Sequence, residues 1–274
     1  MPNIIDVNWL KSRLGSKDLV ILFTSMKDIS TGQAEPIPTT LIPGSIYVDF
    51  EGQFCDHQSP LPHTLANEQQ FEKAAQALGI NADTHLIVYD AKGVYTAPRV
   101  WWMFNVMGYH KISILNGGLP AWLAAQGEVA PSLATPSQRG NFKATRQGQR
   151  IVDVSVLQHN MNNFNIIDAR SAARFHGTAP EPRLGLRSGH IPGSVNLPFT
   201  QVLHGHYLKG HEALKAEFAA LKLDASKDLV MTCGSGVTAC ILALAAEELG
   251  YQNCQVYDGS WSEWGGNNAL PIVN

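Results

Sequence analysis

The 274-residue chain is long enough for more than one average domain. Its hydrophobic content of 45% allows a sizeable buried core and excludes disorder over most of the length. The formal net charge of −3 provides no overall basic field that would attract nucleic acid or a membrane surface. The first residues carry no secretory signal, and no apolar run approaches the roughly 18 residues of a transmembrane helix. We therefore expect a cytoplasmic protein that binds neither nucleic acid nor a membrane.

Short apolar segments alternate with helical segments in both halves of the chain. The expected strands are residues 19–22, 86–89, 112–115, 165–167, 228–231 and 255–257, and the clearest helices are 68–78 and 239–249. Strands alternating with helices are typical of a parallel sheet whose two faces are both covered. The sequence therefore predicts an α/β fold with ligands bound beyond the carboxyl ends of the strands.

The second half of the chain repeats the first. Residues 42–45 recur as residues 191–194, and both segments read Ile-Pro-Gly-Ser. Further identities follow in the same order: Asp6 with Asp153, Gly93 with Gly236, Gly108 with Gly250, Gly117 with Gly259 and Trp122 with Trp264. This collinear series predicts two copies of one domain, 1–125 and 150–274. Residues 126–149, rich in Gly, Pro, Ser, Thr and Gln, are the expected linker.

The strand at 228–231 leads into a loop that carries Cys233, one of four cysteines. Glycines at 234 and 236 allow the backbone to curl, so that successive N–H groups point inward, and the following helix adds the positive end of its dipole. A thiol at that point should ionise readily, and we expect it to be exposed as a nucleophile. No Cys-x-x-Cys pair or Cys/His cluster has zinc spacing, so no metal is expected.

Three chemistries could use such a loop. A cysteinyl-phosphate mechanism requires an Arg six positions after the cysteine, and this chain has Ala239 there. Dinucleotide binding fits Gly-x-Gly-x-x-Ala at 234–239, with Asp258 as the ribose-binding acid, but too few βα units follow to complete that fold. Sulfur transfer requires only the thiolate and an environment that accepts an anion.

Several motifs are similar to those of a known family. They are the loop 233–239, the turn 189–194, the segment 258–264, the pair Arg174-Phe175 and the triplet Glu181-Pro182-Arg183. Together they resemble the tandem-domain branch of the rhodanese superfamily, and within it the 3-mercaptopyruvate sulfurtransferases. The resemblance covers essentially the whole chain. Thiosulfate-preferring relatives usually carry two basic residues after the cysteine, where this chain has Gly234 and Ser235, and this uncharged pair favours a carboxylate-bearing donor.

The resemblance implies a reaction and divides it unequally between the two copies. Cys233 would take sulfur from 3-mercaptopyruvate as a persulfide, release pyruvate, and pass the sulfur to cyanide or to a thiol acceptor such as a thioredoxin-like protein. No cofactor is expected, and the protein would be a monomer. The repeat places Asp90 opposite Cys233. A carboxylate cannot accept a sulfur atom, so the first copy is expected to be catalytically inactive.

The resemblance also implies which residues hold the donor. Arg174 and Arg183 would bind its carboxylate, because a guanidinium meets a carboxylate with two parallel hydrogen bonds. Arg187 is a weaker candidate, and the alternative role for the arginines is a salt bridge with Glu181. The loop positions expected to contact the donor are Gly234, Gly236, Val237 and Thr238.

A proton relay is the remaining part of the expected site. Pyruvate leaves first as its enolate, whose charge must be neutralised. In the family an acid, a histidine and the loop serine form this relay, and Glu51, His63 and Ser235 fit these roles. Asp49 is an alternative acid.

Other conspicuous residues have structural interpretations. Asp168 and Arg170 are expected to form an internal ion pair, and His190 to hydrogen-bond within its turn. Trp261 and Trp264 are expected in the core. Two alternative functions stay open at this point, a thiosulfate sulfurtransferase of the same fold and a rhodanese-like binding module without turnover.

Overall fold

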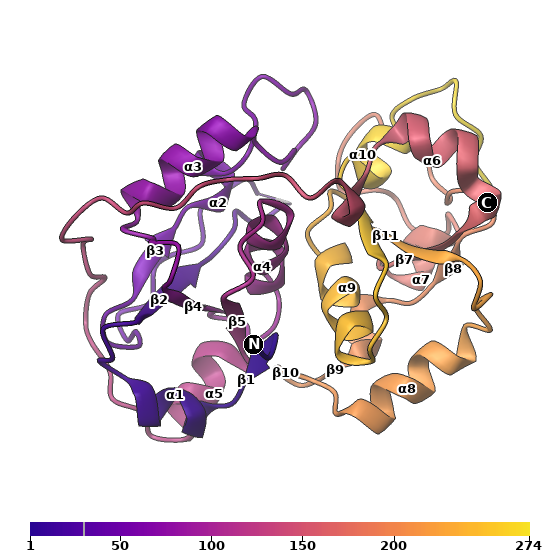
Figure 1. The fold of residues 1–274 in the computed structure, drawn as a ribbon. Helices are drawn as coiled ribbons and strands as arrows, with labels where there is room; N and C mark the ends of the chain where they lie inside the picture. Colours follow the sequence, from indigo (N-terminus) through magenta and orange to yellow (C-terminus); the bar gives the residue numbers. More distant parts are fainter. Residues whose placement is uncertain (30) are drawn as a thin grey trace. The chain divides into compact units, whose positions relative to one another are not determined.

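The computed structural model of the protein describes residues 1–29 and 31–274, which divide into two compact units (Figure 1). Neither unit is one continuous stretch of chain. The first consists of residues 1–56, 65–147 and 205–208, and the second of residues 57–64, 148–204 and 209–274. In the described part of the chain, every helix is too short or too polar to cross a membrane.

The first unit contains six strands and five helices among its described residues. Its strands are β1 (Ile4–Ile5), β2 (Leu19–Thr24), β3 (Ile46–Val48), β4 (His85–Asp90), β5 (Ile112–Leu115) and β10 (Tyr207–Leu208). Its helices are α1 (Val7–Arg13), α2 (Phe50–Gln53), α3 (Glu68–Ala77), α4 (Ala97–Val106) and α5 (Gly118–Ala124).

The second unit has a similar order of elements, with α7 between its second and third strands as an addition. Its strands are β6 (Ile151–Val152), β7 (Phe164–Asp168), β8 (Val195–Asn196), β9 (Leu203–His204), β11 (Asp228–Thr232) and β12 (Cys254–Tyr257). Its α-helices are α6 (Val154–Asn160), α7 (Ala172–Phe175), α8 (His211–Ala220), α9 (Ala239–Glu248) and α10 (Ser260–Trp264). Three 3₁₀ turns accompany them, η1 (Gly148–Arg150), η2 (Met161–Asn163) and η3 (Phe199–Val202).

Both units build the same five-stranded sheet. The first has the strand order β1-β5-β4-β2-β3 and the second has β6-β12-β11-β7-β8. All the pairings within both sheets are parallel. The predicted α/β fold, with helices on both faces of each sheet, is therefore confirmed, with small shifts at the ends of the predicted elements (Figure 1). In each sheet the middle strand leads to the position where the repeat pairs Asp90 with Cys233, since β4 ends at Asp90 and β11 ends at Thr232, directly before Cys233.

One of the repeated identities caps the first helix of each unit. The Asp6 side chain accepts a hydrogen bond from the backbone N–H of Trp9 at 2.7 Å, and Asp153 accepts one from Val156 at 2.8 Å. A side-chain oxygen at this position satisfies an N–H group that has no partner within the helix. The Asp-Val pair recurs because both copies start a helix in the same way.

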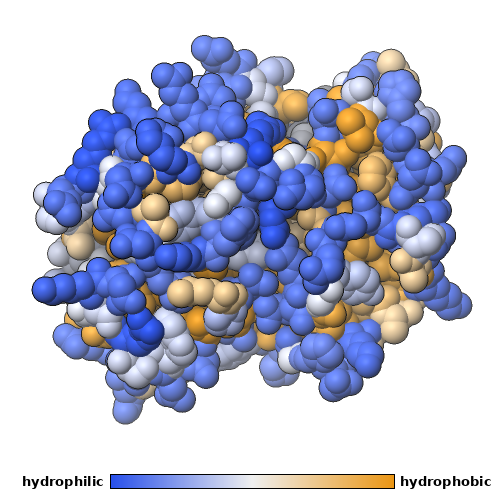
Figure 2. Space-filling view, in the orientation of Figure 1, coloured by the Kyte–Doolittle hydropathy of each residue, from blue (hydrophilic) through white to orange (hydrophobic). Residues whose placement is uncertain are grey.

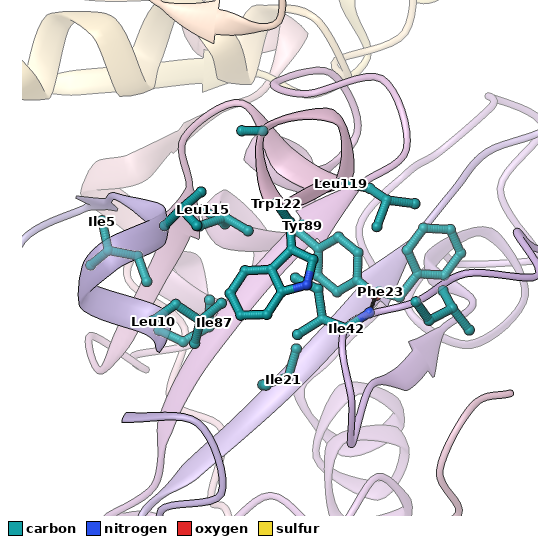
Figure 3. Packing of buried hydrophobic residues seen from close by; sticks show 13 residues of the cluster. Ile5, Leu10, Ile21, Phe23, Ile42, Ile87, Tyr89, Leu115, Leu119 and Trp122 are labelled. Carbon is teal, nitrogen blue, oxygen red and sulfur yellow. Dashed lines mark hydrogen bonds between the residues drawn. The ribbon is translucent and has the colours of Figure 1, made fainter. Parts of the chain in front are cut away.

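Each sheet has an apolar core on the face covered by its first and last helices. In the first unit Trp122 lies among residues of α1, α5, β2 and β4, as Figure 3 shows. In the second unit Trp261 and Trp264 of α10 pack with residues from α6, β7 and β11. Both tryptophans are at most 1% exposed, which confirms their predicted core position. The face of the molecule in Figure 2 is mostly hydrophilic, with apolar residues in small patches.

Candidate active site

The loop that follows β11 carries Cys233 between the middle strand of the second sheet and α9. Gly236 adopts φ +77°, a left-handed conformation that favours glycine, so the predicted curl of the loop occurs there. The helix α9 begins at Ala239, directly after the loop, and its amino-terminal N–H groups face back along the chain toward it. The loop therefore combines a thiol, a tight turn and the positive end of a ten-residue helix.

Two serines that the sequence interpretation left without a role hold the backbone of this loop. The backbone N–H of Cys233 donates to Ser260 Oγ at 3.2 Å, and Ser262 Oγ donates to the carbonyl of Gly234 at 2.7 Å. The backbone N–H groups of Trp261 and Ser262 donate to the carbonyls of Cys233 and Gly234. The two serines lie in the segment 258–264, one of the motifs that carried the family resemblance, and this could have pointed to them.

The expectation that Cys233 is exposed is wrong. The residue is 2% exposed in the structure, and its neighbour Ser235 is 3% exposed. The reason is tertiary, because the segment 260–262 is hydrogen-bonded along the loop, and the apolar side chain of Val237 is also buried. Thr238, at the start of α9, and Gly234 are half-buried.

The structure brings His63 to the Cys233 loop. His63 lies in the segment 57–64, which belongs to the second unit although it comes from the first half of the chain. Its Nδ1 is 2.9 Å from Ser235 Oγ, a hydrogen bond between two residues that are 172 positions apart. His63 has φ +63°, a conformation that is uncommon for a residue with a side chain and that occurs where surrounding contacts enforce it.

The expected acids of the relay lie in the first unit. Glu51 is on α2, where its Oε2 accepts a hydrogen bond from the backbone N–H of Lys27 at 2.8 Å. Asp49 caps the same helix by accepting from the backbone N–H of Gly52 at 2.9 Å. Asp49 thus has a structural role in starting α2. The part of Glu51 in a relay stays a prediction.

Arg174 lies beside the Cys233 loop and also pairs with Glu181. Its Nε is 3.2 Å from each Glu181 carboxylate oxygen, and its Nη2 donates to Oε2. The end of the guanidinium formed by Nη1 and Nη2 faces Gly234, since a Cβ added at Gly234 would lie 3.1 Å from Nη2 and 3.8 Å from Nη1. The salt bridge with Glu181 and the proximity to the loop, which the sequence presented as alternatives, are both present.

Glu181 is buried between two arginines. Its side chain is 1% exposed, and Arg170 Nη1 donates to its Oε1 at 2.8 Å. Arg170 is itself bound by Asp168, with Nη2 to Oδ2 at 2.5 Å, and its guanidinium lies 4.2 Å from the centre of the Trp261 ring. Burial alone would lower the pKa of Arg170, but the Asp168 and Glu181 carboxylates raise it above its ordinary value. The predicted internal pair of Asp168 and Arg170 is confirmed as part of this larger network.

The other two candidate arginines differ in their surroundings. Arg187 donates from Nε, Nη1 and Nη2 to backbone carbonyls of Trp264, Gly265, Asn267 and Leu270. It therefore holds the carboxyl-terminal segment, which explains why it is a poor candidate for a ligand. Arg183 is half-buried, next to the fully exposed Leu184. Its binding role stays a prediction.

His190 has a structural role, as expected, but its side chain bonds outside its own turn. Its Nδ1 is 2.9 Å from the carbonyl of Phe175, and its ring stacks on the Phe175 ring at 3.8 Å. Its backbone pairs with Val273 in an antiparallel bridge. The turn thereby anchors the end of the chain.

The equivalent loop of the first unit is closed by its own carboxylate. Asp90, 2% exposed, accepts hydrogen bonds of 2.8 to 3.0 Å from five backbone N–H groups, those of Lys92, Gly93, Tyr95, Thr96 and Ala97. A ring of N–H groups of this kind is an anion-binding site. In the first unit the anion is part of the chain.

Other candidate chemistry is limited in the described residues. All four cysteines are buried and carry thiols rather than disulfides. Burial raises the pKa of the Cys254 thiol to about 12, so that it stays protonated near neutral pH. Within residues 1–29 and 31–274, no three His, Cys, Asp or Glu side chains are grouped so that they could hold a metal ion.

Two similar units carry a loop after the middle strand of their sheets, and in one of them this loop contains a cysteine. This arrangement indicates the class of protein. The model of the rhodanese-like domain matches residues 6–125 and again residues 153–267. The chain therefore belongs to the rhodanese family and contains two rhodanese-like domains.

Relatives within the family are similar over most of their length. The 3-mercaptopyruvate sulfurtransferase of Escherichia coli K12 is 39% identical over 98% of this chain and 96% of its own. The thiosulfate sulfurtransferase of Bos taurus is 42% identical over 81% of this chain and 76% of its own. The crystal structure of SseA from Escherichia coli, described as a 3-mercaptopyruvate sulfotransferase, matches with a TM-score of 0.83 at 35% identity, covering 95% of this chain and 99% of that one.

Proposed function

We propose that this chain is a 3-mercaptopyruvate sulfurtransferase whose second unit carries the reaction. The observation that supports this most is the position of Arg174, whose guanidinium end lies against Gly234, next to Cys233. A cation at that distance suits a donor that carries a carboxylate and a transferable sulfur in one small molecule. The 39% identity to the Escherichia coli 3-mercaptopyruvate sulfurtransferase supports the same donor.

The proposed first step transfers one sulfur atom. The Cys233 thiolate attacks the sulfur of 3-mercaptopyruvate, a new S–S bond forms, and the C–S bond of the donor breaks. The electron pair of that bond leaves on carbon as the enolate of pyruvate, which takes up one proton to become pyruvate. Cys233 is then a persulfide. In the second step the deprotonated persulfide gives its outer sulfur to cyanide as thiocyanate, or to a thiol, and the Cys233 thiolate returns.

The hydrogen bond between Ser235 and His63 suits the proton that the enolate requires. Ser235 is two residues from the nucleophile, so its hydroxyl can reach a molecule bound at Cys233. His63 can replace the proton that Ser235 gives up, because its Nδ1 lies within hydrogen-bond distance of Ser235 Oγ. Glu51 is proposed as the acid of this relay.

The N–H groups of the loop and the start of α9 are proposed to stabilise the charge that develops on the outer sulfur and the enolate. Gly236, Val237 and Thr238 contribute these groups, and Arg183 joins Arg174 at the carboxylate. No cofactor is needed for these two displacements.

A thiosulfate sulfurtransferase is the second candidate, and the 42% identity to the Bos taurus enzyme favours it. The two candidates are separated by steady-state rates of thiocyanate formation with each donor. We expect kcat/KM to be higher for 3-mercaptopyruvate, with mass spectrometry of the loaded enzyme showing one added sulfur on Cys233. A clear preference for thiosulfate would replace the first candidate by the second. An enzyme that gains no sulfur from either donor would instead be a binding module.

The acceptor, the oligomeric state and the location are also proposals. A thioredoxin-like dithiol protein fits as acceptor, because a second thiol can release the transferred sulfur by forming a disulfide. We propose a cytoplasmic monomer. Light scattering on a sizing column and cell fractionation test these two properties.

A further inference from the structure

Glu181 belongs to no step of the proposed reaction, yet its carboxylate is buried near the Cys233 loop. Its side chain is 1% exposed and pairs with two guanidinium groups, those of Arg170 and Arg174. These two arginines differ in accessibility, because the Arg170 side chain is 0% exposed and that of Arg174 is 23% exposed. Glu181 thus connects an enclosed cation to an accessible one.

The enclosed cation, Arg170, is held from several sides. Arg170 is bound by Asp168 at the end of β7, and its Nη2 donates to the carbonyl of Gly189 at 2.8 Å. The ring of Trp261 covers its face. Because the backbone N–H of Trp261 also donates to the carbonyl of Cys233 at 2.9 Å, the support of Arg170 is continuous with that of the nucleophile's loop.

The accessible cation is the guanidinium of Arg174, which is bound along one edge and open at its outer end. Glu181 takes the edge of Arg174 formed by Nε and Nη2. Nη1 has no hydrogen-bond partner within the described part of the chain. Since Nη1 and Nη2 are the guanidinium atoms nearest to Gly234, the open end faces the loop. A guanidinium has five N–H donors, so the two nitrogens at this end can still bind a carboxylate side by side.

We propose that Glu181 is a positioning residue for the sulfur donor, because it holds Arg174 with its open end toward the Cys233 loop. This inference rests on the proposed function, in which Arg174 binds the donor's carboxylate. Glu181 does not touch the donor. It fixes the rotation of a long side chain that would otherwise sample many conformations, so that the carboxylate is bound at one distance from Cys233.

The role of Glu181 predicts a loss in one half of the reaction only. Loading of Cys233 from 3-mercaptopyruvate requires the carboxylate to be bound, whereas discharge of the persulfide to cyanide does not. We expect Glu181→Gln to lower kcat/KM for 3-mercaptopyruvate about tenfold to a hundredfold, mainly through KM. Persulfide loaded at saturating donor, after removal of excess donor, should react with cyanide at the wild-type rate.

Two further variants keep the test decisive. Glu181→Asp retains the charge that Arg170 needs but shortens the side chain by one methylene, so it should fold and show a smaller rise in KM. Glu247→Gln is the matched control, since it removes another glutamate–arginine pair of the same unit, Glu247 with Arg150 at 2.6 Å, and should change neither half-reaction. In an Arg174→Ala background, Glu181→Asp should cause no additional loss, because the two residues act through one guanidinium.

Equal slowing of both half-reactions in a folded Glu181→Asp variant, losses that multiply with Arg174→Ala, or an unchanged KM would each overturn the positioning role. A wild-type enzyme that takes no sulfur from 3-mercaptopyruvate would overturn the proposed function instead. The two failures are therefore distinguished in one set of assays.

Discussion

The Asp90 loop of the first unit and the Cys233 loop of the second stand at the same place in the same sheet. Each follows the middle strand and precedes a ten-residue helix, α4 or α9. The first loop turns five backbone N–H groups onto the Asp90 carboxylate, which is part of the chain. The second has a thiol at that position and no carboxylate of its own. The same fold thus produces either a loop whose N–H groups bind a carboxylate of the chain itself or a loop that can receive an anion from outside.

The resemblance extends to a histidine beside each loop. The offset that relates Asp90 to Cys233 also relates Lys92 to Ser235 and His63 to His206. His63 bonds to the Ser235 hydroxyl at 2.9 Å, whereas Nδ1 of His206 is 2.9 Å from the backbone carbonyl of Lys92. The first unit therefore has a histidine beside the equivalent loop, but this histidine meets a backbone carbonyl rather than a serine hydroxyl. The two loops differ in side chains at equivalent positions, with Asp90 and Lys92 in the first unit where the second has Cys233 and Ser235.

The strongest test of this comparison removes the thiol. We expect Cys233→Ser to lower kcat on the order of 10³-fold or more, because a hydroxyl cannot form the persulfide. The change is nearly isosteric, so the melting temperature should stay close to that of the wild type. Cys254→Ala is the control for a buried thiol outside the loop, and it should keep full activity. Appreciable turnover by Cys233→Ser would place the nucleophile elsewhere.

The second test concerns the hydrogen bond between the Ser235 hydroxyl and the His63 imidazole, which has no equivalent beside the Asp90 loop. Ser235→Ala and His63→Ala should each lower kcat about a hundredfold, with a double variant little worse than either alone. Stopped-flow measurement of pyruvate release isolates the step concerned. The control is His206→Ala, the equivalent change beside the Asp90 loop, which should leave pyruvate release unchanged. Independent, multiplying losses would argue against a shared relay.

The third test opens the Asp90 loop. Asp90→Asn should lower the free energy of unfolding by about 2–3 kcal/mol, because an amide NH₂ would then face backbone N–H groups that need an acceptor. Urea denaturation followed by circular dichroism measures this. Asp18→Asn, at an exposed pair with Arg13, should cost less than about 0.5 kcal/mol. If Asp90→Asn were as stable as the wild type, the five hydrogen bonds would not be what holds this loop.

The smallest expected effect is that of adding a Cβ at Gly234, whose counterpart in the first unit is Ala91. A Cβ at Gly234 would approach Arg174 Nη2 to 3.1 Å, so Gly234→Ala should raise KM for 3-mercaptopyruvate about fivefold to tenfold by displacing that side chain. The first unit already carries alanine at this position, which indicates that the turn itself tolerates a Cβ. Ala91→Gly should therefore leave KM unchanged. A Gly234→Ala enzyme with normal KM would remove Arg174 from the donor site.

The local features of the site could be predicted from the sequence because they depend on neighbouring residues. The repeat, the parallel α/β fold, the loop glycines and the substitution of Asp90 for Cys233 all follow from patterns over short spans. The burial of Cys233 could not be predicted, since it depends on the segment 260–262 returning to the loop from the next βα unit. The five hydrogen bonds of Asp90 were likewise hidden, although the carboxylate itself was evident.

The sequence by itself thus determined which half of the chain has a side chain capable of accepting sulfur at this position, because that is a matter of residue identity at one position of a repeat. Only the tertiary structure decided what surrounds it. His63 comes from the other half of the sequence. The carboxylate of Glu181 is buried where it pairs with Arg174, and this pairing leaves one end of the Arg174 guanidinium open. Such relations join residues far apart in the chain or depend on which atoms of a side chain are already bound. Neither property can be read from the order of the residues.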